Sequence, residues 1–195
     1  MIFDTFMFND ELDMLECRLT ELQDVPDLKH VVIESSTSHR GKPKLLNYVE
    51  NRERFAPWKG RVRLAIAFTL PESPDPWDRE PKQREYARSG LWDAKPGDAV
   101  LHGDVDEIPS TTALGMIADG RVPLDGPVVL GQRHLMYACD WEYPAPFWPG
   151  TIAVSSACQY SPVRLTAGSR LITRPGTRSS GPSNSRTSIP VARLA

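Results

Sequence analysis

The sequence predicts an α/β protein with a mostly parallel sheet flanked by helices. Leucines recur every three or four residues from Leu12 to Leu22, which indicates an amphipathic helix. Strands joined through helices pair in parallel, because a crossover connection returns the chain to the same end of the sheet. With 195 residues, 40% of them hydrophobic, the chain can form one globular domain. Apolar runs suited to buried strands occur at 2–8, 30–36, 61–68 and 99–102.

The first strand and helix occupy residues 1–25. Asn9 or Asp10 is expected to cap the helix, and its charged residues, Arg18 among them, fall mostly between the leucines. Asp4 resembles the start of a phosphatase-type Asp-x-Asp-x-Thr loop, but Phe6 holds the position of the second aspartate. A structural use of Asp4, or a metal-free ligand contact, is therefore favoured over a phosphoryl-accepting role.

The second strand ends at an acidic residue and leads into a basic loop. Glu34 lies at the carboxyl end of the run, where ligand-binding residues of α/β folds tend to lie. The loop at 38–44 suits a diphosphate or another acidic ligand, although a solvated turn is the alternative. A charged helical stretch is expected at 48–55, before the third strand at 61–68.

The fourth strand leads into the most distinctive stretch of the chain. A proline-rich loop at 69–78 and a helix at 82–92 precede it. Asp104, Asp106 and Glu107 follow it directly, and carboxylates packed so closely repel one another. A hard divalent cation with oxygen ligands, carrying phosphate on its far side, would relieve that repulsion. The stretch therefore predicts a metal site at the carboxyl edge of the sheet.

The remaining elements are expected in the order helix, strand and aromatic loop. Ser110 or Thr111 can cap a helix that runs to Gly120. An apolar strand is expected at 128–131, continuing through 133–139. The stretch 140–150 is rich in aromatic residues and prolines, and it is either a platform for a sugar ring or a loop that covers the core.

Charge and cysteine content exclude several classes of protein. All 25 acidic residues precede Tyr143, so the acidic body offers no broad basic field for nucleic acid. Cys17, Cys139 and Cys158 lack metal-type spacing and are expected to be reduced thiols that fill the core of a cytosolic protein. No basic region precedes a long apolar run, so neither a signal peptide nor a transmembrane segment is expected.

Several short motifs follow one another along the chain in an order that resembles a known family. They lie at 3–6, 9–12, 15–19, 32–34, 41–44, 50–55, 83–84 and 103–109, and in a strand with Arg133 and Tyr137 that ends near Trp141. Over roughly residues 1–156 this series resembles glycosyltransferase family 17. A run of motifs in order is more specific than the acidic stretch alone.

The resemblance implies a GT-A-like nucleotide-diphospho-sugar transferase fold. The corresponding domain, 1–160, is expected to be incomplete at its C-terminal end. Residues 161–195 contain no acid and consist mainly of serine, threonine, arginine, glycine and proline. They are expected to form a low-complexity tail that is disordered or translated from a shifted reading frame.

The resemblance also implies metal-dependent transfer of a sugar, with inversion, from a UDP-sugar to a glycan acceptor. UDP-GlcNAc is the donor that the family suggests. Asp106 is expected to ligate Mn²⁺ or Mg²⁺ bridging the two phosphates, and Asp104 to face the ribose or the water shell of the metal. Glu107 would either orient these groups around the metal or hydrogen-bond the backbone of the turn.

Candidate residues for the nucleotide pocket and for the catalytic base complete the site. Glu34, Lys44, Gln83 and Arg84 are candidates for the pocket, together with Asp104, although each of the first four could be a surface ion-pair partner instead. An inverting transfer needs a carboxylate base beside the acceptor hydroxyl. The candidates are Asp140 and Glu142.

Two other functions remain open at this point. A non-catalytic sugar-nucleotide-binding domain would share the donor site. A metal-dependent phosphohydrolase would also use clustered aspartates, but it would be expected to show a second acidic or histidine cluster, and the four histidines are scattered. The expected location is the cytoplasm, including the membrane periphery, and the sequence indicates neither the acceptor nor the oligomeric state.

Overall fold

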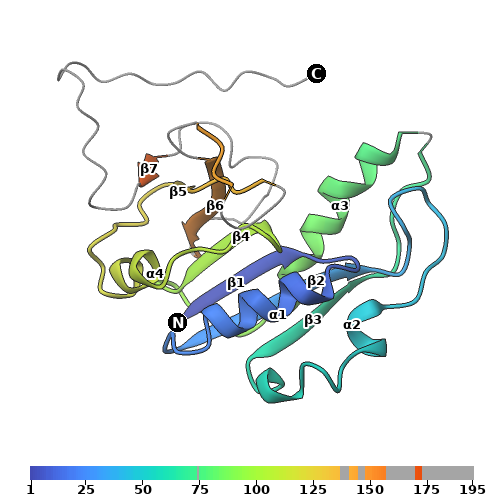
Figure 1. The fold of residues 1–195 in the computed structure, drawn as a ribbon, viewed down its shortest axis with the longest axis horizontal. Helices are drawn as coiled ribbons and strands as arrows, with labels where there is room; N and C mark the ends of the chain where they lie inside the picture. Colours follow the sequence, from blue (N-terminus) through green and yellow to red (C-terminus); the bar gives the residue numbers. More distant parts are fainter. Residues whose placement is uncertain (74, 137–140, 145–147, 157–169, 173–195) are drawn as a thin grey trace.

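The computed structural model describes residues 1–73, 75–136, 141–144, 148–156 and 170–172. The described part is built around a seven-stranded sheet in the order β3-β2-β1-β4-β6-β5-β7 (Figure 1). Helices lie against the sheet, so the predicted α/β class is confirmed.

The first four strands form the parallel part of the sheet. β1 lies between β2 and β4, and β2 pairs with β3, in each case in parallel. All four carboxyl ends therefore lie at one edge of the sheet. The predicted parallel pairing is confirmed, and the strands are β1 (Ile2–Met7), β2 (Leu28–Ser35), β3 (Val62–Ala67) and β4 (Ala99–Asp104).

The remaining strands are β5 (Val128–Gln132), β6 (Trp148–Ser155) and β7 (Arg170–Ile172). β6 is antiparallel to both β4 and β5, while β7 is parallel to β5. β6 was not predicted from the sequence, because Pro149 and Gly150 at its start are poor strand residues. The predicted continuation of the strand beyond Gln132 is wrong for residues 133–136, and residues 137–139 lie outside the described part.

Helices cover both faces of the sheet. On one face lie α1 (Leu12–Glu21) and α4 (Thr111–Ala118), and on the other lies α3 (Arg79–Glu85), continued by η3 (Tyr86–Gly90). The other short helices are α2 (Asn47–Glu50), η1 (Ala56–Trp58) and η2 (Pro76–Asp78). The predicted helical stretch at 48–55 is thus wrong beyond Glu50, where turns replace it.

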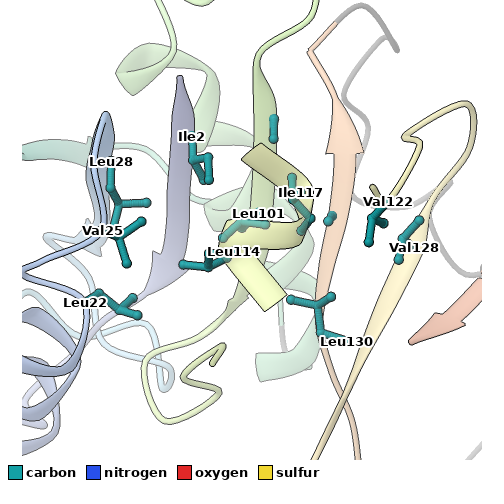
Figure 2. Packing of buried hydrophobic residues seen from close by; sticks show 12 residues of the cluster. Ile2, Leu22, Val25, Leu28, Leu101, Leu114, Ile117, Val122, Val128 and Leu130 are labelled. Carbon is teal, nitrogen blue, oxygen red and sulfur yellow. The ribbon is translucent and has the colours of Figure 1, made fainter. Parts of the chain in front are cut away.

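Three buried hydrophobic clusters join the helices to the sheet. Figure 2 shows the largest, in which Leu22 after α1 and Leu114 and Ile117 of α4 lie over the sheet. A second cluster packs α1 against Phe6 and Val32. The third lies on the opposite face, under η3. Because side chains alternate along a strand, the polar residues in the middle of β1 and near the end of β4 also face one helix layer or the other.

Two helix starts test the predicted caps. Ser110 accepts a hydrogen bond from Ala113 N at 3.2 Å, so the predicted cap of α4 is confirmed. The N-cap of α1 is Glu11, not Asn9 or Asp10, and it makes no side-chain cap hydrogen bond. Instead its carboxylate accepts hydrogen bonds from the backbone N–H groups of Asn9 and Asp10, at 3.0 and 3.1 Å.

Several other predictions can be compared with the structure only in part, because some of their residues lie outside the described part. Cys17 is exposed and not a core filler, because the outward face of α1 carries it, while Cys139 and Cys158 lie outside the described part. Within the predicted tail only β7 is described, so the boundary at residue 160 stays a prediction. Among the residues that the structure describes, no helix is long and apolar enough to cross a membrane.

Candidate functional site

A cavity of about 870 Å³ opens at the carboxyl edge of the parallel strands. Its walls come from the segments that follow β1, β2 and β4, and from α3. The volume falls in the range of roughly 300–1,000 Å³ typical of small-molecule sites. In open α/β sheets ligands bind at this edge, because loops from several strands converge there.

Five of the predicted site residues line this cavity: Lys44, Gln83, Arg84, Asp104 and Asp106. They come from three segments far apart in the sequence, which the parallel strand order brings together. Basic and acidic side chains thus share one cavity. Such a mixture suits a ligand that carries phosphate and is accompanied by a cation.

Arg84 is the most extensively bonded of these residues. Its Nη2 donates to Asp104 Oδ1 at 2.8 Å and to Glu80 Oε1 at 2.7 Å. Burial would lower the pKa of Arg84, but the negative charges of Asp104 and Glu80 raise it above its ordinary value. The guanidinium therefore stays charged and ties α3 to the end of β4.

A hydrogen-bonded chain behind Arg84 fixes its orientation. Arg84 Nη1 lies 3.1 Å from His102 Nε2, and His102 Nδ1 lies 2.9 Å from Thr5 Oγ1. Thr5 donates its own proton to Leu101 O, so His102 Nδ1 must be the donor to Thr5, and Nε2 accepts from Arg84. Burial, followed by the charges of Arg84 and Arg18, lowers the pKa of His102 to about 3. His102 is accordingly neutral in this chain of contacts.

Arg18 supports the acidic loop, residues 104–107, from beneath. It is fully buried, and its Nη1 donates to the carbonyl oxygens of Asp104, Val105 and Glu107, at 3.0, 3.1 and 3.0 Å. Its other nitrogens donate to both carboxylate oxygens of Asp4, at 2.9 and 2.6 Å. One guanidinium therefore fixes the backbone of the loop against the centre of β1.

Arg18 was predicted to lie with the polar residues between the leucines of α1, and this prediction is wrong. Arg18 lies three residues after Leu15 and four before Leu22, on the same face of the helix, so it points inward. The sequence did contain a signal for this pair. Arg18 occupies an inward position of the helix, and Asp4 lies inside the neighbouring strand. Asp4 is fully buried between Arg18 and His30, which agrees with the predicted structural use.

Asp106 and Glu107 leave the loop in different directions. Asp106 is exposed at the wall of the cavity, and its carboxylate makes no hydrogen bond or ion pair within the described residues. Glu107 Oε2 accepts from Asp104 N at 3.0 Å, and its Oε1 accepts from the Trp148 indole at 3.2 Å. Burial raises the pKa of Glu107, and the charge of Asp104 adds to this. Its position matches the predicted alternative, a hydrogen bond to the backbone of the turn.

Glu34 lies behind the cavity wall and not in it. Its side chain is fully buried and accepts hydrogen bonds from Lys44 Nζ at 2.7 Å and from the backbone N–H groups of Asn47 and Tyr48, at 2.6 and 3.0 Å. Glu34 thus holds Lys44 at the cavity and caps the first turn of α2. Glu34 forms an ion pair, as in the predicted alternative, but on its side the pair is buried and not at the surface, and a direct nucleotide contact stays a prediction.

Of the two residues predicted as catalytic base, only Glu142 lies in the described structure, and it does not line the cavity. Glu142 pairs with Arg133 at 2.7 Å on the surface, and the hydrogen bond from Arg133 lowers its pKa. Glu142 does not line the large cavity of about 870 Å³, and it does not line a second cavity of about 230 Å³ beside Glu107. Asp140 lies outside the described residues. The base therefore stays a prediction.

Two solved structures resemble the fold over much of the chain. One is 4-diphosphocytidyl-2C-methyl-D-erythritol synthase from Anaerococcus prevotii, 12% identical with a TM-score of 0.44, covering 88% of this chain and 86% of that one. The other is galactosyltransferase LgtC with donor and acceptor sugar analogues, 15% identical with a TM-score of 0.40, covering 78% of this chain and 57% of that one. Both scores are low, so the α/β class rests on the sheet and helices described above.

Similar sequences give a more specific result. The β-1,4-mannosyl-glycoprotein 4-β-N-acetylglucosaminyltransferases of Rattus norvegicus and Homo sapiens are each 26% identical over 177 residues. These matches cover 86% of this chain, which spans about a third of the length of the two relatives, 31% and 32%. The model of glycosyltransferase family 17 matches residues 1–178. The chain therefore belongs to glycosyltransferase family 17.

Proposed function

We propose that this chain binds a nucleotide sugar in the large cavity and takes part in metal-dependent, inverting transfer of the sugar to a glycan. The observation that carries the proposal is the convergence of Lys44, Gln83, Arg84, Asp104 and Asp106 on one cavity at the carboxyl edge of the sheet. UDP-GlcNAc as the donor and a β-mannosyl glycan as the acceptor follow from the names of the relatives. A GT-A-like fold is part of the same proposal.

The basic side chains of the cavity would bind the diphosphate. Lys44 is held by Glu34, and Arg84 is held by Glu80, His102 and Asp104, so both cations are positioned before a ligand arrives. Positioned charges lose little conformational entropy on binding. Gln83 donates to Ile33 O at 3.3 Å, which places its amide on the same wall for contact with the nucleotide.

The acidic loop suits a hard divalent cation whose remaining coordination positions are filled by the phosphates of the nucleotide sugar. Asp106 offers a carboxylate that no side chain of the described residues occupies, and Asp104 has one oxygen that Arg84 does not contact. Within the described residues, no group of three His, Cys, Asp or Glu side chains could hold a metal ion alone. Mg²⁺ is often bound by one or two carboxylates plus substrate phosphates, and Mn²⁺ accepts similar ligands. When bound, the cation would neutralise the leaving diphosphate.

A thermal-shift experiment tests the donor site. UDP-GlcNAc with Mn²⁺ should raise the melting temperature of the wild-type chain, by an amount that grows with ligand concentration. Asp106→Ala should abolish this gain and leave the unliganded melting temperature nearly unchanged, because Asp106 is exposed. Asp119→Ala, an exposed aspartate after α4, is the matched control and should retain the full gain. No gain in the wild-type chain would contradict the proposal.

Product analysis separates the alternatives. Release of UDP with a β-mannosyl acceptor, together with a new glycosidic bond, would identify a transferase, and donor binding without release would identify a binding module. Phosphate release from simple phosphoesters would identify a hydrolase. Asp4 is buried between Arg18 and His30, so a substrate cannot reach it as a phosphoryl acceptor.

A cytoplasmic location, including the membrane periphery, is also part of the proposal, and fractionation of the native cells tests it.

A further inference from the structure

Three partly exposed aromatic rings lie beside the acidic loop and outside the large cavity. His134 contacts both of the others, with ring centroids 5.6 Å from Tyr143 and 4.7 Å from Trp148. Tyr143 is 49% exposed and Trp148 is 44% exposed, so about half of each residue remains open to a ligand. We call this trio the aromatic platform.

The platform is held by backbone pairing. Met136 N donates to Trp141 O at 2.8 Å, and Tyr143 N donates to His134 O at 2.7 Å. These bonds place His134 and Tyr143 side by side on two short antiparallel segments. Trp148 begins β6 and pairs with Gln132, the last residue of β5. The rings are therefore arranged by the ends of two strands and by the pairing between them.

The platform is joined directly to the acidic loop. The Trp148 indole N–H donates to Glu107 Oε1 at 3.2 Å, and the other oxygen of Glu107 accepts from Asp104 N. Gly103 leaves room for this carboxylate, since a Cβ there would come within 2.6 Å of Glu107 Oε2. The indole is thus oriented by the same loop that carries Asp106.

The topology places the platform on the side of the acidic loop opposite the large cavity. β6 is antiparallel to both β4 and β5, so β5 runs in the direction of β4 and ends at the same edge. A second cavity of about 230 Å³ lies there, lined by Glu107, Pro149 and Gly150. It shares Arg84 and Asp104 with the large cavity. A ligand at the platform would therefore adjoin a donor bound in the large cavity.

We propose that the aromatic platform binds a pyranose ring of the sugar acceptor, with the apolar face of the ring on the Trp148 indole. A pyranose presents C–H groups on one face and hydroxyl groups around its rim. Tryptophan offers a large flat surface that loses little conformational freedom on binding. The glutamate fixed beside the indole can accept hydrogen bonds from the rim hydroxyls. This inference rests on the proposed function, because the ring is identified as an acceptor by its place beside the donor cavity.

Saturation-transfer NMR and ligand titration on the full chain test the inference, with methyl β-D-mannopyranoside as the probe in the presence of UDP and Mn²⁺. Trp148→Ala should weaken binding of the mannoside by about tenfold, because it removes the largest flat apolar surface of the platform. Trp148→Phe keeps a ring and should restore most of that binding. Trp92→Ala removes another exposed tryptophan, which lies beside Arg63 far from the platform, and should have no effect.

Affinity for UDP with Mn²⁺ should be the same in all four proteins, which separates this inference from the proposed function. If UDP binds and the mannoside does not bind, or binds Trp148→Ala as well as the wild type, the platform is not an acceptor site. Loss of UDP affinity in Trp148→Ala would also overturn the inference, because the platform would then contact the donor. Failure of UDP to bind the wild-type chain, with Trp148-dependent mannoside binding intact, would reject the donor site and keep the platform.

Discussion

At the scale of single residues, the buried pair of Asp4 and Arg18 is the interaction on which the acidic loop depends most directly. Both side chains are fully buried, and a charge in that environment is tolerated only with partners. Burial alone would raise the pKa of Asp4, but the charge and hydrogen bonds of Arg18, with those of His30, hold it well below its ordinary value. Asp4 is therefore ionised in the folded chain at neutral pH.

Replacing Asp4 with asparagine tests this pair. Asp4→Asn leaves Arg18 charged and buried without its counterion, so we expect the free energy of unfolding to fall by about 3–5 kcal/mol. Urea unfolding at pH 7 measures the change. Asp13→Asn is the matched control, because Asp13 is an exposed partner of Arg54 and should cost less than about 1 kcal/mol. Equal losses in the two variants would contradict the assignment.

The same pair predicts a dependence of stability on pH. Because the pKa of Asp4 is lower in the folded than in the unfolded state, its ionisation stabilises the fold above the unfolded value of about 4. This contribution is lost as pH falls below that value. The difference in unfolding free energy between the wild type and Asp4→Asn should therefore be constant from pH 7 to about 5 and shrink in more acidic urea titrations. A difference that grows on acidification would contradict the lowered pKa of Asp4 in the folded state.

At the scale of elements, short helix α2 depends on a side chain from β2. Glu34 accepts hydrogen bonds from the first backbone N–H groups of α2, which have no partner within the helix. A helix of only four residues cannot persist on its own propensity. The link between Glu34 and α2 therefore positions Lys44, in the preceding loop, at the cavity.

Replacing Glu34 with glutamine should loosen α2 without unfolding the sheet. Glu34→Gln removes the charge that strengthens three hydrogen bonds, at an expected cost of about 1–3 kcal/mol. Hydrogen exchange should quicken at Asn47 and Tyr48 and stay slow in β1 and β2. Glu50→Gln, at an exposed position of the same helix, should leave the exchange rates unchanged. Uniform quickening through the sheet would mean that Glu34 supports the whole fold instead.

At the scale of the whole molecule, the acidic loop is held from both helix layers. Arg18 reaches its carbonyl groups from α1, and Arg84 reaches the side chain of Asp104 from α3 on the other face. The central strands carry the partners of both, with Asp4 on one face and His102 on the other. The loop therefore keeps its shape only while the layers are packed together.

Arg18→Lys tests this link between the core and the site. Lysine keeps the charge but cannot donate to Asp4 and to three carbonyl oxygens at once. The affinity for UDP with Mn²⁺ should fall by about 3- to 30-fold, corresponding to a coupling of roughly 0.5–2 kcal/mol. Calorimetric titration well below the melting temperature separates this effect from unfolding. Full affinity in a folded Arg18→Lys protein would show that the loop does not need the clamp.

Local patterns alone predicted a large part of this protein. The apolar runs of β1 to β4, the leucine spacing of α1 and the cap at Ser110 are short-range features, and each reflects interactions within a few residues. The carboxyl ends of parallel strands meet at one edge, so the cavity containing Asp104 and Asp106 could also be anticipated. β6 was missed, because Pro149 and Gly150 at its start are poor strand residues and its pairing with β4 and β5 depends on residues far from it in the sequence.

The sequence by itself determined the α/β class, the acidic loop and the order of motifs that identifies the family. Only the tertiary structure decided what individual charges do. Arg18 points inward, where it bonds Asp4 and three carbonyl groups, and Glu34 lies behind the cavity wall, where it caps α2. Such partners lie 13 to 89 residues away along the chain. Packing of the helix and sheet layers brings each charge to its partner. The local sequence around a charged residue therefore does not predict which partner it has.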